Sequence, residues 1–130
     1  MRFLLDTDSI SFALRGQGRV GEALRRRSPS EVCTSSVVAG ELELGVARRG
    51  SRKLRRELDA LYSGLEVIPY DLEAARRYGR LAAVLLDEGV PIGVEDTMIA
   101  AHALSRGLIL VTHNREHFDR VRGLRVEDWF

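Results

Sequence analysis

Residues 91–104 read PIGVEDTMIAAHAL, a glycine-containing turn followed by two adjacent carboxylates and an apolar, alanine-rich segment. The apolar segment predicts a helix, with Glu95 and Asp96 at or near its first turn. Helix starts favour negative charge, because their backbone N–H groups are unpaired and the helix dipole is positive there. A further carboxylate, Asp6, directly follows the short apolar run Phe3–Leu5. Ligands bind at the carboxyl ends of parallel strands, so a strand-end acid and a helix-start acid can meet in one site.

Short apolar runs that predict strands alternate with segments of helical spacing along the whole chain. Strands are expected at residues 3–5, 32–34, 66–69 and 108–111, with a closing edge strand at 124–126. One short helix is expected to end near residue 27, and two others are expected to begin after Ser35 or Ser36 and after Gly50-Ser51. Two more are expected from Asp71 to Gly89 and over residues 95–104. Residues 6–9 should supply a turn and helix-capping groups, and residues 112–114 a polar loop. This alternation predicts an α/β fold with a mainly parallel central sheet flanked by helices on both faces.

Length and composition limit the class of protein. The chain has 130 residues, of which 45% are hydrophobic and 30% charged, so residues 1–130 are expected to form one soluble domain. The single Cys33 excludes an intrachain disulfide, and its apolar surroundings predict a buried thiol. No signal-type or membrane-spanning apolar stretch is present, which predicts a cytoplasmic protein.

Charge distribution says more about partners than net charge does. The net charge of +1 does not indicate a nucleic-acid partner, but arginines cluster within residues 25–27, 48–56 and 76–80. Such clusters can contact phosphates, although solvated helix faces look the same.

Five acids are candidates for a chemical site: Asp6, Asp8, Glu41, Glu95 and Asp96. Like charges placed together are costly unless they share a proton or a cation. A hard divalent ion such as Mg²⁺ takes oxygen ligands and keeps waters and substrate phosphate oxygens as partners. Such ions generate a hydroxide nucleophile and stabilise the leaving oxygen of a phosphodiester. The acids therefore point to metal-assisted phosphodiester chemistry.

The histidines offer a weaker alternative. His113 and His117 have the i, i+4 spacing of a zinc site, but partner ligands are absent and Cys33 stands alone. His102, within the apolar helix, is expected to be a core or rim residue. Neither a Walker-type phosphate loop nor a serine nucleophile elbow is present.

The opening Asp6-Thr7-Asp8-Ser9 also resembles the Asp-x-Asp start of haloacid dehalogenase-type phosphatases. That family requires a downstream lysine, whereas the only lysine here is Lys53, inside an arginine-rich helix. The chain is also short for that fold.

Taken together, the fragments resemble the PIN-domain family, and within it the VapC toxins of bacterial toxin–antitoxin pairs. The resemblance covers nearly the whole chain, and the order and spacing of its fragments are specific. They lie at residues 4–8 (LLDTD), 35–42 (SSVVAGEL), 91–96 (PIGVED), 99–103 (IAAHA), 110–112 (LVT), Phe118 and 121–129 (VRGLRVEDW).

The resemblance implies a Mg²⁺-dependent endoribonuclease, with Mn²⁺ as a possible substitute. By position, Asp6, Glu41 and Asp96 match the carboxylates that hold the metal and activate water, and Thr112 matches a supporting hydroxyl. The fourth acidic position of the family is Asn114 here. An Asn can still hydrogen-bond a water on the metal, but one negative charge is removed, which should weaken a second metal site. Asp119 and Glu95 are the acids that could replace that charge.

Family membership further implies a homodimer, an RNA substrate for which tRNA is the expectation, and inhibition by a VapB-type antitoxin encoded beside the toxin. That partner would place a helix or tail in a groove near the helix hairpin around Gly50-Ser51, often sending a basic side chain into the acidic pocket. The Leu54, Leu58 and Leu61 stripe is expected to serve either that groove or the core. The alternative function is a non-catalytic PIN-like module that binds RNA or protein through the same surface.

Overall fold

A five-stranded parallel sheet forms the centre of the computed structural model, which describes all 130 residues. The strands are β1 (Phe3–Leu5), β2 (Val32–Ser35), β3 (Glu66–Ile68), β4 (Ile109–Val111) and β5 (Val126–Glu127), in the order β3-β2-β1-β4-β5. Phe3 of the central strand is in register with Val32 of β2 and Ile109 of β4. Successive strands run outward from β1 to one edge and then from β4 to the other. The strand order therefore reverses between β1 and β4, where α/β sheets place their ligand crevice.

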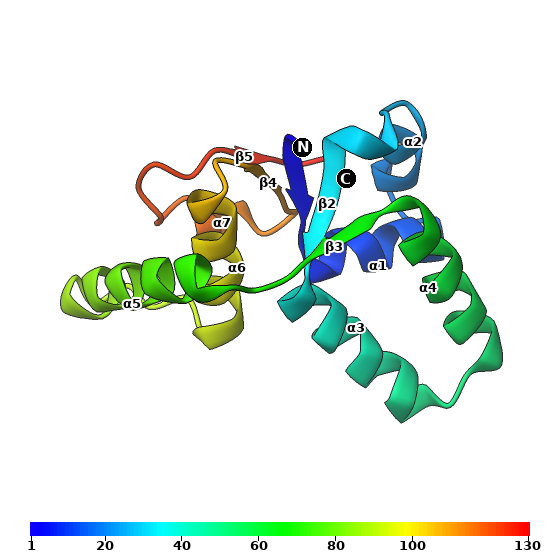
Figure 1. Ribbon diagram of the computed structural model, residues 1–130, viewed down its shortest axis with the longest axis horizontal. Helices are drawn as coiled ribbons and strands as arrows, with labels where there is room; N and C mark the ends of the chain where they lie inside the picture. Colours follow the sequence, from blue (N-terminus) through cyan, green and yellow to red (C-terminus); the bar gives the residue numbers. More distant parts are fainter.

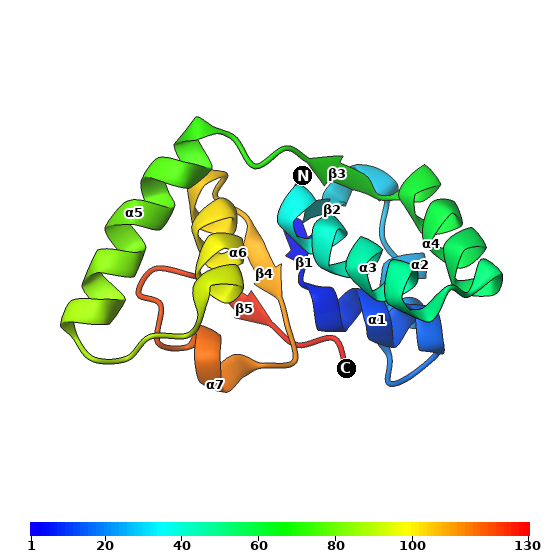
Figure 2. The same ribbon diagram turned by 90° about the horizontal axis from the view of Figure 1, so that it is seen from below.

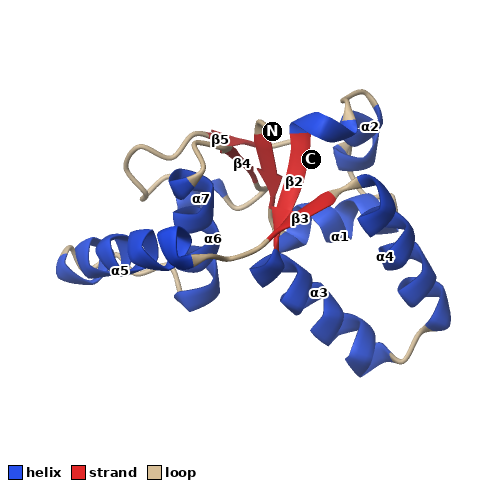
Figure 3. Cartoon of the chain, in the orientation of Figure 1, coloured by secondary structure: helices blue, strands red, loops and turns tan.

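Helices lie on both sides of this sheet, as predicted. They are α1 (Thr7–Arg15), α2 (Val20–Arg25), α3 (Ser36–Arg49), α4 (Arg52–Gly64), α5 (Leu72–Asp87), α6 (Val94–Ser105) and α7 (Arg115–Phe118), with a 3₁₀ turn at Pro29–Glu31. Figure 1 and Figure 3 show α1 to α4 on one side of the strands and α5 to α7 on the other. The α3–α4 pair forms the predicted hairpin, and Figure 2 shows it standing beside α1. None of the helices is long and apolar enough to cross a lipid bilayer.

Local capping chemistry fixes the helix starts that matter for the site. The Asp6 carboxylate accepts from the backbone N–H of Ser9, and the Ser35 hydroxyl accepts from that of Val37. Each side chain pairs one of the donors that a helix start leaves free. The start of α6 has no side-chain cap and follows Gly93, whose φ of 94° belongs to the left-handed region that favours glycine. The first turns of α1 and α6 lie on either side of the carboxyl end of β4 (Figure 2).

The core lies between the sheet and the two helical layers. The three residues of β1 and the three of β4 are all buried, as expected for parallel strands covered on both faces. Cys33 of β2 is a buried free thiol, as predicted, and burial raises its pKa to about 11. His102 is fully buried, and its Nδ1 lies 2.8 Å from the Ser35 hydroxyl, so the prediction of a core histidine is confirmed.

Several predicted boundaries were wrong. Residues 6–9, predicted to form a turn with capping groups, begin a full helix, α1. The following helix ends at Arg25 instead of near residue 27. The edge strand is Val126–Glu127 instead of 124–126, whereas residues 112–114 form the predicted polar loop, which leads into the unpredicted helix α7. These shifts leave the order of elements unchanged.

Candidate active site

Asp6 is held at the carboxyl end of β1 by bonds to two neighbouring elements. Its backbone N–H donates to the Val111 carbonyl at 3.0 Å, and its Oδ1 accepts from the Ser9 N–H at 2.9 Å. The side chain is 5% exposed. Burial raises the pKa of this carboxyl, while hydrogen bonds from Thr112 and Ser9 oppose the rise. Asp6 is therefore a fixed, nearly buried carboxylate whose charge is costly without a counter-ion.

Glu41 reaches the same region from α3. Thr7 donates its hydroxyl to Glu41 Oε1 at 2.5 Å, which joins the first turn of α1 to the middle of α3. Burial raises the pKa of Glu41, and the negative charges of Asp96, Glu95 and Asp8 raise it further. Glu41 is therefore a partly buried carboxylate with three other acids near it.

Asp96 arrives from the first turn of α6, as predicted. Its Oδ2 lies 3.2 Å from Nδ1 of His117, a residue of α7. The side chains of Asp96 and His117 are 32% and 40% exposed, so the pair lies at the rim of the site.

These side chains line one pocket of about 120 Å³. Its lining residues are Asp6, Thr7, Asp8, Glu41, Asp96, Ile99, Asn114 and Phe118. No lysine or arginine is among them, so nothing in the lining neutralises the carboxylates. A set of carboxylate and amide oxygens without a cationic side chain is the donor set that hard divalent ions prefer.

The carboxylates are close but do not form a ready-made metal cage. No three His, Cys, Asp or Glu side chains lie close enough together to hold an ion as they stand. Two of the three carboxylates are instead turned to other partners, Glu41 to Thr7 and Asp96 to His117. The donor chemistry thus fits a divalent cation, although the three carboxylates as they stand are too far apart to share one.

The remaining predicted site residues divide into two groups. Asn114 lines the pocket, whereas Thr112 is fully buried behind it, where its hydroxyl accepts from the Asn114 N–H at 3.0 Å. Glu95 and Asp119 are exposed and do not line the pocket, and Asp119 faces Arg115 across 4.0 Å. The extra acid in the pocket is Asp8, which sequence reasoning considered but did not assign.

The structure separates the two histidines of the zinc-like pair. His113 Nδ1 lies 2.9 Å from Asp128 Oδ2, whereas Nδ1 of His117 lies 3.2 Å from Asp96 Oδ2. Their helical spacing therefore does not produce a shared site. The contact between His117 and Asp96 was not predicted from the sequence, because no local pattern connects residues 21 positions apart.

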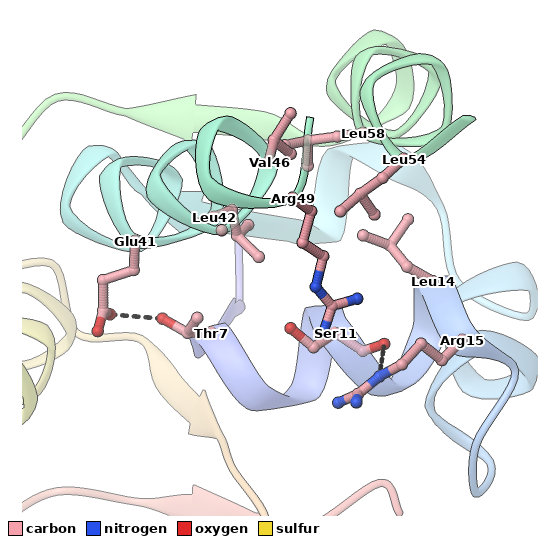
Figure 4. Close-up of a pocket in the computed structure, with 11 residues that line it drawn as sticks. Thr7, Ser11, Leu14, Arg15, Glu41, Leu42, Val46, Arg49, Leu54 and Leu58 are labelled. Carbon is pink, nitrogen blue, oxygen red and sulfur yellow. Dashed lines mark hydrogen bonds between the residues drawn. The ribbon is translucent and has the colours of Figure 1, made fainter. Parts of the chain in front are cut away.

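A second hollow, which we call the hairpin groove, adjoins the acidic pocket. It measures about 160 Å³, lies between α1, α3 and α4, and includes Thr7 and Glu41, which also line the acidic pocket. Leu14, Leu42, Val46, Leu54 and Leu58 supply its apolar wall (Figure 4). Leu61, predicted to share this face, instead lines a separate hollow beside α2. Arg15 lies at the end of the groove away from Glu41, and Arg49 lies between them in the view of Figure 4.

The arginine clusters have mixed uses. Arg27 packs its guanidinium over the rings of Phe3 and Trp129 at 4.4 and 4.6 Å, which is a structural role. Arg55 pairs with Glu43 at 2.6 Å and with Asp59 at 2.7 Å. Arg76, Arg77 and Arg80 lie on α5, and none of them has a salt-bridge partner.

Comparison with known proteins agrees with this geometry. Residues 3–124 match the PIN domain family. A tRNA(fMet)-specific endonuclease VapC from Salmonella typhimurium is 37% identical over 133 residues, covering 99% of this chain and 98% of the relative. The protein of the same name from Shigella flexneri is 38% identical over 132 residues, with the same coverage.

Solved structures show the same fold. The crystal structure of VapBC2 from Rickettsia felis bound to a DNA fragment from its promoter gives a TM-score of 0.90 at 29% identity and covers 100% of both chains. The DNA-bound VapBC of Salmonella typhimurium gives 0.88 at 37% identity, covering 100% of this chain and 99% of that one.

Proposed function

The chain belongs to the PIN-domain family, among the VapC ribonucleases, and from this premise we propose that it is a metal-dependent endoribonuclease and the toxin of a toxin–antitoxin pair. The single observation that carries the proposal is the acidic pocket itself. Asp6, Glu41 and Asp96 come from three distant parts of the chain and line one hollow that contains no basic side chain. Burial of such carboxylates is unfavourable unless a cation compensates them.

Asp6, Glu41 and Asp96 would hold Mg²⁺, with Mn²⁺ as a substitute. Such an ion supplies Lewis acidity, which activates water and offsets charge on the phosphodiester during hydrolysis. Asp6 offers the most fixed ligand, because its position is set by the Ser9 N–H and the end of β4. Thr112 orients Asp6 and the Asn114 backbone from behind the pocket. Asn114 presents an amide where an acid would add charge, so we assign it to orienting water rather than to binding a second ion.

RNA is the proposed substrate, with tRNA as the preferred class because two relatives are named as tRNA(fMet)-specific endonucleases. The unpaired arginines of α5 and those at the α3–α4 turn are candidates for phosphate contacts, which position RNA without reading its sequence. Action on tRNA places the protein in the cytoplasm.

The test is cleavage of a mixed tRNA pool by the purified protein with Mg²⁺, with Mn²⁺ and with EDTA. Discrete metal-dependent cuts are expected, and they should disappear in Asp6→Asn and Asp96→Asn, which keep the side-chain shape and remove the charge. Asp119→Asn is the matched control, because Asp119 lies outside the pocket. Cuts that persist in the first two variants would refute the assignment of the ligands.

The alternative, a non-catalytic module that binds RNA or protein, is not favoured by relatives that are named as ribonucleases. Absence of Mg²⁺ and Mn²⁺ binding in calorimetry, together with absence of cleavage, would favour it instead.

We further propose that a VapB-type antitoxin binds in the hairpin groove and reaches the acidic pocket with a basic side chain. Support comes from the apolar wall of the groove and from Glu41 and Thr7, which connect it to the pocket. The structures of similar fold are of VapBC complexes. Apolar grooves of this kind accept the apolar face of a helix.

Gly45 provides a specific test of that groove. It lines the groove, and a Cβ built there would meet no atom within 4 Å, so the backbone leaves room for a side chain that extends into the hollow. Gly45→Phe should weaken binding of the protein encoded by the neighbouring gene at least tenfold. Gly40→Phe is the matched control, since Gly40 lies on the same helix, is equally unobstructed and does not line the groove. Equal affinities for both variants would place the partner elsewhere.

A homodimer through the α5–α6 face is the third part of the proposal. Leu86 and Val94 are 66% and 57% exposed, and both line an apolar hollow with Tyr78 and Pro91. Leu86→Asp should convert the protein to a monomer in light scattering, whereas Leu44→Asp, on an equally exposed leucine of α3, should not.

A further inference from the structure

His117 is held firmly enough to orient another side chain, although it lies on a helix of only four residues. The next residue, Phe118, is 1% exposed and lines the acidic pocket. The helix is tied to the loop after β4, because the Phe118 N–H donates to the Asn114 carbonyl and the Asn114 N–H donates to Thr112. The buried ring therefore sets the direction of α7, and His117 points from it to the first turn of α6.

Two further contacts hold the segment after α7 against the connection between α5 and α6. The Arg120 guanidinium donates to the Pro91 carbonyl at 3.3 Å, and Arg122 pairs with Glu88 at 2.7 Å. A third contact, 3.2 Å between His117 of α7 and Asp96 of α6, lies beside these two. Both of these arginine contacts are exposed and contribute little, so the position of His117 relative to Asp96 depends mainly on the buried Phe118.

The chemistry of the contact assigns its polarity. An ionised carboxylate only accepts hydrogen bonds, so Nδ1 of His117 carries the hydrogen and donates it to Oδ2 of Asp96. Asp96 also lines the acidic pocket, and this contact engages only one of its two oxygens. A carboxylate with one oxygen hydrogen-bonded in this way is restricted in rotation and presents the other to a cation.

We propose that His117 is a positioning residue for Asp96: its Nδ1–H holds one carboxylate oxygen, so that the other faces a divalent cation in the acidic pocket. This inference rests on the proposed function, because it assumes that Asp96 is a metal ligand. It assigns a role to a residue that does not line the pocket. If the contact were a simple surface ion pair, it would contribute little to folding stability, and its removal would leave the affinity for the cation unchanged.

The experiment measures Mn²⁺ affinity by calorimetry on the full chain, without substrate, for the wild type and four variants. His117→Ala and His117→Gln should each weaken Mn²⁺ binding about tenfold or more, the usual effect of losing a group that orients a ligand. His117→Asn should stay close to wild type, because Asn Nδ2 is attached at the same branch point as His Nδ1 and can donate the same hydrogen bond. His113→Ala should bind normally, since His113 pairs with Asp128.

Thermal denaturation in EDTA checks that all variants fold alike. Wild-type affinity in His117→Ala would overturn the positioning role, and so would an equal loss in His117→Asn and His117→Ala, because the hydrogen bond would then not be the cause. A wild-type protein that binds no Mn²⁺ would instead overturn the proposed function, and this inference with it.

Discussion

Replacing Asp6 by asparagine should stabilise the protein when no divalent cation is present and should abolish its stabilisation by Mn²⁺. The carboxylate is 5% exposed, and burial raises its pKa above the ordinary value. The folded state therefore holds the proton more tightly than the unfolded state does. Stability is lost as the pH rises from the unfolded pKa through the folded one, and above it the charged Asp6 destabilises the fold. Asparagine does not titrate and avoids this cost at pH 7.5.

The size of the effect follows from separating charge from capping. Each unit by which burial raises a pKa corresponds to about 1.4 kcal/mol of destabilisation once the group is ionised. Asparagine caps helices as well as aspartate does, so the bond to the Ser9 N–H, 2.9 Å in the wild type, should persist. Asp6→Ala loses both the charge and the cap, and it should be about 1 kcal/mol less stable than Asp6→Asn.

The assay is denaturant unfolding at pH 7.5 of the wild type, Asp6→Asn and Asp6→Ala, in EDTA and in saturating Mn²⁺. In EDTA the expected order of stability places Asp6→Asn first. With Mn²⁺ at about 100 times its dissociation constant, the wild type should gain about 2.7 kcal/mol and become the most stable. Neither variant should gain comparably. The order of stability thus inverts when the cation is added.

Two results would refute this reasoning. An Asp6→Asn protein that is less stable than the wild type in EDTA would mean that the buried charge is already compensated within the fold. Equal stabilisation of the wild type and Asp6→Asn by Mn²⁺ would mean that the cation binds without Asp6.

Three further predictions concern other parts of the chain. Asn114→Asp adds a carboxylate to the acidic pocket and should tighten Mn²⁺ binding and add a second, weaker binding step in calorimetry. The pKa of Glu43 is lowered to about 2, chiefly by its hydrogen bond from Arg55. Glu43→Gln should therefore lose about 0.5–1 kcal/mol of folding stability at pH 7. In urea unfolding, this loss should shrink as the pH falls from about 4.5 to about 2. Gly18→Ala should destabilise more than Gly16→Ala in thermal denaturation, because both have positive φ but only at Gly18 would the new Cβ lie 2.7 Å from the ring of Phe130.

The sequence predicted the parts of this fold that are locally encoded. Asp6 and Asp96 were identified because each follows a change from one pattern to another, an apolar strand in one case and a glycine turn in the other. Strands β1 and β4 are continuous apolar runs, as is typical of a parallel sheet covered on both faces. The predicted order of elements, the parallel sheet and the hairpin are confirmed for the same reason.

The helices that escaped prediction lack such signals. Thr7–Arg15 begins with Thr, Asp and Ser, which compete for backbone hydrogen bonds and favour caps over helix interiors, and its buried residues are only Ser9 and Ile10. Its stability depends on the Asp6 cap and on packing against α2 and α3. The α7 helix is too short for a helical period and depends on the burial of Phe118.

The contacts that shape the candidate site connect residues far apart in sequence. Thr7 and Glu41 are separated by 34 positions, and His117 and Asp96 by 21. No local pattern encodes such pairs. The leucines of α4 make the same point, since a stripe at helical spacing cannot show that Leu61 faces a different hollow from Leu54 and Leu58.

The Thr7–Glu41 hydrogen bond lies where the acidic pocket and the hairpin groove meet, and both residues line both hollows. Any change in the direction of the Glu41 carboxylate therefore alters the acidic pocket and the hairpin groove at the same time. Thermodynamic linkage then requires reciprocity: if an occupant of the groove alters cation affinity by some factor, the cation alters the affinity of that occupant by the same factor. If the pocket holds Mg²⁺ and the groove holds the antitoxin, as proposed, a change in free Mg²⁺ would also change how tightly that partner binds.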